Sequence, residues 1–303
     1  MLVVAALGGN ALLKRGEPLT AQAQRANVKR AAEALAALVR AGHRLVVTHG
    51  NGPQVGLLAL QGASYKPDEA YPLDVLGAET EGMIGYMIEQ ELENALGHDQ
   101  PVATLLTQVV VDRRDPAFGK PTKFVGPIYE RDEAEARAKA AGWAIAADGA
   151  KWRRVVASPQ PVDIPDLRVV KLLLDQGVIV ICAGGGGIPV IQRDDGSLVG
   201  VEAVIDKDAA SALLARKLGA DALLLLTDVD AVYRDFGTEA AARITHLTPS
   251  EADALEAPAG SMGPKLSAGR DFALTGGFTG IGRLEDALHI LDGQAGTRIE
   301  GER

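Results

Sequence analysis

The sequence predicts an α/β protein built on a parallel sheet, and three observations lead to that prediction. Short apolar runs of the kind that are buried on both faces of a parallel sheet recur along the 303 residues, at 2–7, 44–48, 178–182 and 222–227. Three of these runs are followed at once by a glycine-rich turn. Stretches with helical spacing lie between the runs, and this alternation predicts parallel strands joined by right-handed crossovers.

The connecting segments are expected to be helices where apolar residues recur every three or four positions. One such helix follows Thr20 and should stop at Gly42, and a second should stop at Gly97. Asp206 is expected to cap a helix that stops at Gly219. The other expected elements are an irregular segment at 68–77, a strand at 102–111, a helix at 167–176, a hairpin across 188–199, a helix at 263–275, and a strand, helix and strand at 277–282, 284–291 and 297–299.

Residues 112–161 interrupt this alternation. The segment is rich in charged residues and proline, holds both tryptophans, Trp143 and Trp152, and has little sustained periodicity. Insertions of this length are either ordered lids or disordered segments, and the aromatic residues favour an ordered one. We expect a small subdomain of hairpins that protrudes from the sheet.

Composition restricts the classes of partner and the compartment. A net charge of −9 argues against non-specific binding to nucleic acid or to an anionic membrane. No window approaches ~18 uninterrupted apolar residues, and no secretory signal pattern is visible. The single cysteine, Cys182, excludes an internal disulfide, and its expected role is that of a small buried hydrophobe. We therefore expect a cytoplasmic protein with no membrane segment.

The stretch 178–191, VIVICAGGGGIPVI, is the one around which we expect the fold to be organised, with its strand at the centre. The four glycines from Gly184 to Gly187 carry no Cβ, so their backbone can approach a ligand closely and offer N–H groups to an anion. A flexible turn is the alternative, but a linker does not normally separate two apolar strands. Ligands of open α/β sheets bind at the carboxyl ends of strands, so this loop is the expected floor of the active site.

Two further glycine loops follow predicted strands, namely Gly8-Gly9-Asn10 and Gly50-Asn51-Gly52. Three such loops at strand ends suggest a site built for phosphate oxygens. The two common nucleotide fingerprints are missing, because no G-x-x-x-x-G-K-[ST] occurs and no G-x-G-x-x-G joins the first strand to the first helix. The expected phosphate site is therefore of another type.

Three lysines are candidates for binding that phosphate. Lys207 lies between Asp206 and Asp208 at a predicted helix start, where the helix N-terminus favours an anion and a carboxylate can hold the ammonium group. The alternative is a capping aspartate beside a solvated lysine. Lys265 has the same position at the next predicted helix. Lys123 lies in the protruding segment and, by composition alone, would be a surface charge.

Other chemistry-bearing residues give weaker signals. The five histidines have no metal-binding spacing, and His49, the one in a candidate loop, is expected to be a neutral turn residue. Asp228 and Asp230 could bind Mg²⁺ or could equally cap or turn the chain. No nucleophile elbow and no cysteine with a partnering histidine is evident.

Taken together, these motifs resemble those of the carbamate kinases, a branch of the amino acid kinase family. The lid-like segment is where that branch differs from relatives such as acetylglutamate kinase, uridylate kinase and aspartokinase. The resemblance covers nearly the whole chain, and THGNGPQVG and AGGGGIPV are its most specific parts. The motifs, in the order that the resemblance requires, are GGNAL at 8–12, THGNGPQVG at 48–56, PTK..GP at 121–127, AGGGGIPV at 183–190, VIDKDAAS.LLA at 204–215 and GSMGPK at 260–265.

The resemblance implies an open αβα sandwich around a mainly parallel sheet of about eight strands, with a small protruding lid. Residues 1–183 would form an N-terminal lobe for carbamate or carbamoyl phosphate, with 112–161 as its inserted lid, and 184–303 would form the nucleotide lobe. The implied reaction, with Mg²⁺, is ATP + carbamate = ADP + carbamoyl phosphate. It is often run in reverse to make ATP after arginine or other carbamoyl compounds are degraded. A homodimer is expected.

The same resemblance implies a role for each candidate residue. Lys123 would reach in from the lid, Lys207 and Lys265 would hold nucleotide phosphates, and Asp208 would orient the lysines. Mg²⁺ would be held mainly through the nucleotide phosphates rather than by protein ligands. The transferred phosphoryl group and the carbamate would be lined by Gly8, Gly9, Asn10, Gly50, Asn51, Gly52, Gly184 and Gly185, and the nucleotide would be contacted at Asp228, Tyr233 and Met262.

Two alternatives are compatible with these motifs. The first is another amino acid kinase that acts on an acyl carboxylate such as N-acetylglutamate, but it would need space for a side chain, and Lys123 in a long lid argues against it. The second is a sensor that binds nucleotide or carbamoyl phosphate without turnover. The three lysines and Asp208 argue against a sensor, because a pure binder does not need charge aimed at a bridging phosphoryl group.

Overall fold

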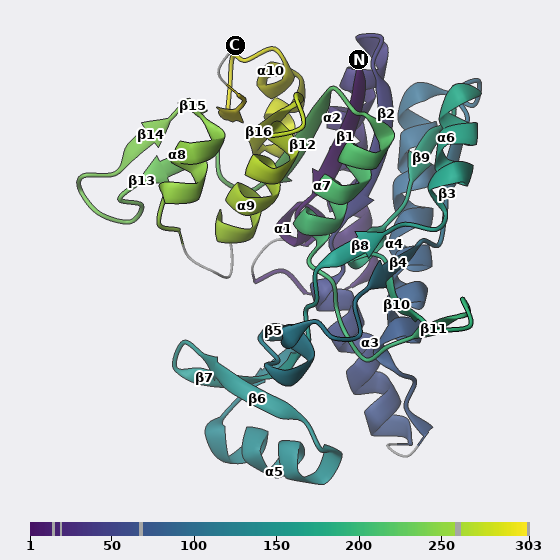
Figure 1. Cartoon of the computed structure of the whole chain (residues 1–303), viewed down its shortest axis with the longest axis vertical. Coiled ribbons are helices and arrows are strands. Elements are labelled where there is room, and N and C mark those ends of the chain that lie inside the picture. Colours follow the sequence, from purple (N-terminus) through teal and green to yellow (C-terminus); the bar gives the residue numbers. More distant parts are fainter. Residues whose placement is uncertain (14–15, 19, 67–68, 258–261, 302–303) are drawn as a thin grey trace.

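The computed structural model describes residues 1–13, 16–18, 20–66, 69–257 and 262–301, and its largest unit is an eight-stranded sheet (Figure 1). All neighbouring strands in it are parallel except the antiparallel pair β16 and β17. The prediction of a mainly parallel sheet of about eight strands is therefore confirmed. In spatial order the strands are β15 (His246–Leu247), β17 (Thr297–Ile299), β16 (Phe278–Arg283), β12 (Ala222–Thr227), β1 (Leu2–Leu7), β2 (Arg44–His49), β9 (Ile179–Ile181) and β3 (Val102–Thr104).

Helices cover both faces of this sheet, because its inner strands are apolar on both faces. Every residue of β1 is buried, and alternate residues of the strand contribute to two different hydrophobic clusters. One cluster includes α2 (Ala21–Arg40), α4 (Leu73–Leu96) and α10 (Ala287–Leu291). The other includes α6 (Leu167–Asp175), α7 (Lys207–Leu218) and α9 (Met262–Ala273). The arrangement is the αβα sandwich that the sequence predicted.

Local signals placed several helix ends correctly. The hydroxyl of Thr20 accepts a hydrogen bond from the N–H of Ala23 at the start of α2. Asp206 caps α7 by accepting the N–H groups of the second and third helical residues, and Gly219 ends that helix in the left-handed conformation. These contacts lie within a few residues of each other, which is why the sequence alone predicts them.

Three predictions about the sheet region were wrong. The strand expected at 102–111 is two strands, β3 in the main sheet and β4 (Gln108–Val111) in a second, four-stranded sheet ordered β11-β10-β4-β8. The segment expected to be irregular at 68–77 enters α4 at Leu73. The strand before the four glycines is not central, because β9 lies next to the edge strand β3, whereas β12 and β1 occupy the middle. The other strands of the second sheet are β8 (Pro161–Asp163), β10 (Ile188–Gln192) and β11 (Leu198–Gly200), and the last two form the predicted hairpin.

The protruding segment is ordered and lies apart from the main sheet, at the lower end of the molecule in Figure 1. We call residues 112–161 the lid. Its antiparallel sheet has the order β5-β7-β6, formed by β5 (Lys123–Tyr129), β6 (Ala144–Asp148) and β7 (Lys151–Val156). Instead of several hairpins, the lid has one, formed by β6 and β7, and β5 is connected to it by a helix that was not expected, α5 (Arg131–Ala141). This helix buries only Ala134 and so has no apolar periodicity to detect.

The remaining elements are short, apart from α3 (Gly52–Tyr65), which begins directly after the second glycine loop. The helix expected at 284–291 is a 3₁₀ turn followed by α10. None of the helices in the described part of the chain is long and apolar enough to cross a membrane. The short elements are α1 (Gly9–Leu12), η2 (Pro116–Gly119), η3 (Gly184–Gly186), β13 (Val232–Arg234), β14 (Ala242–Ile244), α8 (Pro249–Ala254) and η4 (Leu284–Asp286).

Candidate active site

The carboxyl ends of β12, β1 and β2 lie side by side. The first glycine loop follows β1 and the second follows β2. The N–H of Gly8 donates to the carbonyl of Leu226 in β12 at 2.9 Å, and the N–H of Gly50 donates to the carbonyl of Leu7 in β1 at 3.0 Å. These bonds extend the parallel ladders by one residue and fix where each loop leaves the sheet. The loops therefore start from a common edge, as expected for a ligand site of an open α/β sheet.

Three lysines from three separate elements converge on two carboxylates at this edge. Lys265, in the first turn of α9, donates to Oδ2 of Asp208 at 3.0 Å, and Lys207 donates to Oδ1 of the same carboxylate. Lys123, the first residue of β5 in the lid, donates to Oδ2 of Asp206 at 2.7 Å. These five residues form what we call the lysine cluster. Its formal charge is +1, in a chain whose net charge is −9.

The electrostatics of the lysine cluster keep its carboxylates ionised. Burial by itself would raise the pKa of Asp208, but Lys207 and Lys265 outweigh burial and hold that pKa well below its ordinary value. At Asp206, burial raises the pKa of the carboxyl group and Lys123 lowers it, and the net result is again a lowered pKa. For Lys207, burial lowers the pKa of the ammonium group and Asp208 opposes the shift. The charges of the cluster thus depend on one another.

A pair of hydroxyl groups fixes the start of α7 against β2. The hydroxyl of Ser211 donates to the carbonyl of Lys207 at 2.6 Å, and Thr48 Oγ1 lies 2.6 Å from Ser211 Oγ. Both side chains are fully buried. Since β2 leads directly into the second glycine loop, these bonds set the distance between that loop and Lys207.

Gly50, Gly184 and Gly185 pack against neighbouring loops with little or no space for a side chain, whereas a Cβ on Gly9 or Gly52 would meet nothing within 4 Å. A Cβ on Gly184 would overlap the His49 ring, and a Cβ on Gly185, whose φ is +67°, would overlap the Asn51 amide. A Cβ on Gly50 would lie 3.2 Å from the N of Gly9 and 3.5 Å from the Cδ of Lys207. The three loops and the stem of Lys207 therefore form one packed unit, which is the physical reason for glycine at these positions.

Glu81 of α4 holds the third loop in place, although it is not among the residues predicted from the sequence. Its two carboxylate oxygens accept the N–H groups of Gly184 at 2.7 Å and of Thr107 at 3.0 Å. The hydroxyl of Thr107 in turn accepts the N–H of Ala183 at 3.0 Å, at a residue whose φ of +50° is unusual outside glycine. Burial raises the pKa of Glu81 to about 8, although the two N–H bonds oppose that shift.

A signal for Glu81 does exist in the sequence. Glu81 lies three residues before Ile84 and seven before Ile88, so it shares the buried stripe of α4. A carboxylate on such a stripe needs hydrogen-bond partners, which marks it as a structural or functional residue.

His49 is neutral, as expected, but it is the last residue of β2 rather than a turn residue. Its Nδ1 donates to the carbonyl of Gly50 at 3.1 Å, and its buried Nε2 has no hydrogen-bond partner. Burial, and then the charge of Lys207, lower the pKa of His49 to about 4, although the bond to Gly50 opposes the shift. His49 therefore lies behind the glycine loop as an uncharged packing group.

The remaining candidates lie around this unit. Gly52 opens α3 and Asn10 lies in α1, with a side chain outside the described part of the structure. Asp228 follows β12 and accepts a hydrogen bond from the hydroxyl of Thr227 at 3.1 Å. The hydroxyl of Tyr233 in β13 donates to the carboxylate of Asp230 at 3.2 Å rather than to the lysine cluster.

The last of the candidates, Met262, begins α9 and packs against the hydrophobic cluster beneath α7 and α9. The residues before it, 258–261, which include part of the GSMGPK motif, lie outside the described residues. Within the described ranges, no group of three or more His, Cys, Asp and Glu residues is placed to hold a metal ion.

Comparisons with known proteins agree with this architecture. The sequence pattern of the amino acid kinase family matches residues 1–279. The carbamate kinase of Rhizobium meliloti is 57% identical over 302 residues, which span 99% of this chain and 93% of that protein. The carbamate kinase of Haemophilus influenzae is 55% identical over 300 residues, or 99% of this chain and 96% of that protein.

A solved structure has the same fold. The carbamate kinase of Giardia lamblia bound to AMP-PNP superposes with a TM-score of 0.91 at 40% identity, over 99% of this chain and 98% of that one. The fold, the order of the motifs and the similarity over the full length lead to one conclusion: the chain belongs to the amino acid kinase family and, within it, to the carbamate kinases.

Proposed function

We propose that this protein is a phosphotransferase that catalyses ATP + carbamate = ADP + carbamoyl phosphate. The observation that carries the proposal is the lysine cluster, in which cations from the lid, α7 and α9 meet where parallel strands end. Relatives that are 43% to 57% identical over nearly the whole chain are named carbamate kinase, which supports the same reaction here.

The chemistry of this reaction suits the site. Carbamate presents an oxygen that is already anionic, so no general base is needed to activate it. The difficulty is to bring that anion against a polyphosphate, and phosphoryl transfer depends mainly on in-line positioning and on neutralising charge. Buried ammonium groups and loop N–H groups supply both. In this proposal Lys207 and Lys265 hold nucleotide phosphates, Lys123 closes over the transferred group and Asp208 orients the lysines.

The two lobes divide the substrates between them. Residues 1–183 bind carbamate or carbamoyl phosphate through Gly8, Gly9, Asn10, Gly50, Asn51 and Gly52, and Gly184 and Gly185 complete this surface. Residues 184–303 bind the nucleotide, with Asp228, Tyr233 and Met262 at its contacts. The close packing of the glycine loops and the position of Lys207 beside them support this division.

Magnesium completes the proposal through the nucleotide. The carboxylates nearest the phosphoryl site already pair with lysines, and the described residues offer no protein-only set of metal ligands. This chain therefore suits Mg²⁺ that is held by phosphate oxygens and water, as is usual for this ion in kinases. Bound in that way, Mg²⁺ supplies charge neutralisation at the phosphoryl group.

The proposal also includes a homodimer located in the cytoplasm that makes ATP from carbamoyl phosphate. Self-association is supported by large apolar side chains that are exposed on α4 and just beyond β3, namely Val75, Met83, Tyr86 and Leu106. The buried free thiol of Cys182 fits a reducing compartment. The net charge of −9 fits small-molecule substrates rather than nucleic acid.

The direct test is ATP formation from ADP, Mg²⁺ and freshly prepared carbamoyl phosphate, with acetyl phosphate as a parallel donor. We expect Mg²⁺-dependent ATP production that strongly prefers carbamoyl phosphate. Comparable rates with acetyl phosphate would favour a kinase for an acyl carboxylate. Stoichiometric binding by folded protein without turnover would favour a sensor, and either result would contradict the proposal.

Replacement of either buried lysine tests the roles assigned in the lysine cluster. Lys207→Ala and Lys265→Ala are each expected to lower kcat by at least ~100-fold, the cost of losing one such electrostatic contact in a transition state. Lys217→Ala is the control, because Lys217 lies at the other end of α7 in a surface ion pair with Asp163. Its rate should stay within about 2-fold of the wild type. A near-wild-type rate for Lys207→Ala or Lys265→Ala, in protein with native circular dichroism, refutes the assignment.

The neutral state of His49 gives a prediction about pH. Its folded-state pKa of about 4 is below the ordinary 6.5, so the folded protein binds fewer protons than the unfolded chain between these values. The resulting stabilisation is complete above pH 6.5 and is lost as the pH falls towards 4. In NMR spectra of histidine-labelled protein, the His49 resonance, assigned by its loss in His49→Asn, should not titrate between pH 5.5 and 8. In urea the same ring should titrate near its ordinary value, and a midpoint near 6.5 in the folded protein would disprove the assignment.

A further inference from the structure

Two motif glycines take no part in the site described above, and they touch each other. Gly56 lies in the second turn of α3, and Gly126 lies in β5 of the lid. A Cβ built on Gly56 would lie 2.5 Å from the Cα of Gly126 and 2.7 Å from its N. Side chains do not approach backbone this closely, so the helix and the lid strand are in direct backbone contact.

The conformation of β5 turns Gly126 towards α3. The register between β5 and β7 shifts between Val125 and Ile128, and Gly126 within this bulge has a φ of +78°. The side chain of Arg153 in β7 donates to the carbonyl of Gly126 at 2.7 Å, which fixes the bulge to the lid sheet. Bulges of this kind bend a strand and redirect it, and here the bend brings the lid onto the helix.

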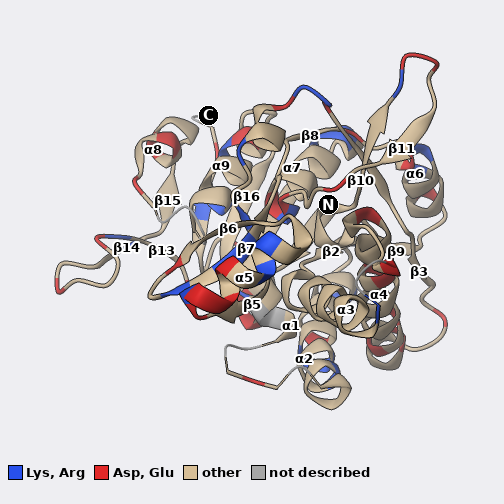
Figure 2. Ribbon diagram, turned by 90° about the horizontal axis from the view of Figure 1, so that it is seen from below, with Lys and Arg blue, Asp and Glu red and all other residues tan. Residues whose placement is uncertain are grey.

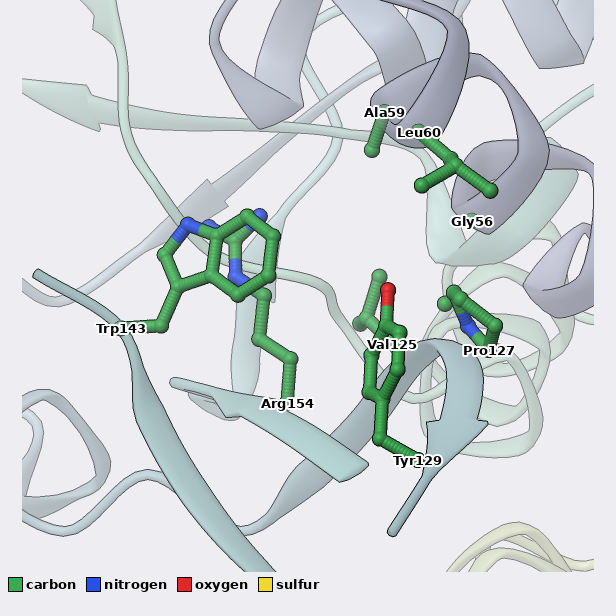
Figure 3. A pocket seen from close by; sticks show the side chains of 9 residues that line it. Gly56, Ala59, Leu60, Val125, Pro127, Tyr129, Trp143 and Arg154 are labelled. Carbon is green, nitrogen blue, oxygen red and sulfur yellow. The ribbon is translucent and has the colours of Figure 1, made fainter. Parts of the chain in front are cut away.

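Apolar contacts surround the two glycines. A small hydrophobic cluster joins Val55 of α3 to Val125 and Val156 of the lid. None of the residues of α3 is charged, and Figure 2 shows α3 as uncharged, whereas the lid carries both acidic and basic residues. Beside the contact is a small cavity, in which Trp143 and Arg154 of the lid face Ala59 and Leu60 of α3 (Figure 3).

Both glycines are connected to the lysine cluster by a few residues of chain. Gly126 follows Lys123, the first residue of β5, by three positions. Gly56 is one helical turn from Gly52, where α3 leaves the second glycine loop. The distance between helix and lid at this contact therefore also sets the distance between that loop and the ammonium group of Lys123.

We propose that Gly56 and Gly126 are positioning residues whose backbone contact sets how closely the lid packs on α3 and so holds Lys123 at the phosphoryl site. The tests of this inference that measure turnover also rest on the proposed function. The tests that do not measure turnover rest only on the geometry of the contact. A side chain at position 56 has to push the lid away, because the atoms that it would meet belong to backbone.

The first experiment compares two Gly to Ala substitutions in the same helix. Gly56→Ala meets Gly126, whereas a Cβ at Gly62 of α3 has its nearest neighbour at 3.8 Å, which is ordinary contact. We expect Gly56→Ala to lower kcat by about 10-fold or more, as displaced catalytic groups do. Gly62→Ala should stay within about 2-fold. Equal rates in the two variants would overturn the proposal.

A double-mutant cycle shows whether the effect passes through Lys123. If it does, Gly56→Ala lowers kcat in the wild type but changes it by less than about 2-fold in a Lys123→Ala background. Independent, multiplying losses in the double variant would mean that Gly56 acts elsewhere. If Gly56→Ala does not fold, Val125→Ala takes its place, because it loosens the same contact from the lid side without a clash.

A fluorescence measurement tests the contact without turnover. Both tryptophans belong to the lid, and a Trp152→Phe background leaves Trp143, which lines the cavity against α3. In that background Gly56→Ala should increase acrylamide quenching of Trp143 and shift its emission to the red, and Gly62→Ala should do neither. Unchanged quenching overturns the positioning role. Increased quenching in a protein that makes no ATP would support the contact while the proposed function fails.

Discussion

The pairing of Lys207 and Lys265 with the carboxylate of Asp208 is the interaction on which the rest of the site depends. Lys207 and Lys265 are both largely buried, and without the carboxylate between them they would repel each other and remain poorly solvated. Breaking a buried ion pair by removing one partner costs about 3 to 5 kcal/mol, so the position of each of the three groups depends on the other two. Because Asp208 lies in the first turn of α7 and Lys265 lies in the first turn of α9, the packing of these two helices brings the charged groups together.

Asp206 likewise positions a lysine by pairing with it, and this lysine belongs to the lid. One of its oxygens caps α7, and the other pairs with Lys123 from β5, so a single side chain ties the lid to the helix end that carries Lys207. In the proposed function this arrangement positions the lysines for phosphate oxygens, and the net positive charge of the cluster is what a phosphate would neutralise. Preorganised charge of this kind avoids reorganisation at the moment of reaction. Glu81 positions backbone rather than side chains, since it accepts the N–H of Gly184 and holds that loop against His49 and Asn51.

The sequence predicted what depends on neighbouring residues. The buried run of β12 and the caps at Asp206 and Gly219 are local patterns, and each is confirmed. Pairs such as Lys123 with Asp206, 83 residues apart, and Glu81 with Gly184, 103 apart, depend on tertiary packing that no local pattern contains. The roles of the lysines therefore came from the family resemblance rather than from spacing. The error at 102–111 has a related cause, because the mostly apolar sequence VATLLTQVVV does not show where the chain passes from one sheet to another.

In the proposed mechanism Asp208 acts by placing two ammonium groups, and the substitution Asp208→Glu is the sharpest test of this role. This substitution keeps the charge, so the lysines remain paired and the fold should persist, but it moves both ammonium groups by the length of one methylene. We predict a thermal midpoint close to that of the wild type and a kcat for ATP formation lowered by about 100-fold, the scale of loss for a 1 Å misplacement. A wild-type kcat in this variant would mean that the lysines are positioned by something other than Asp208.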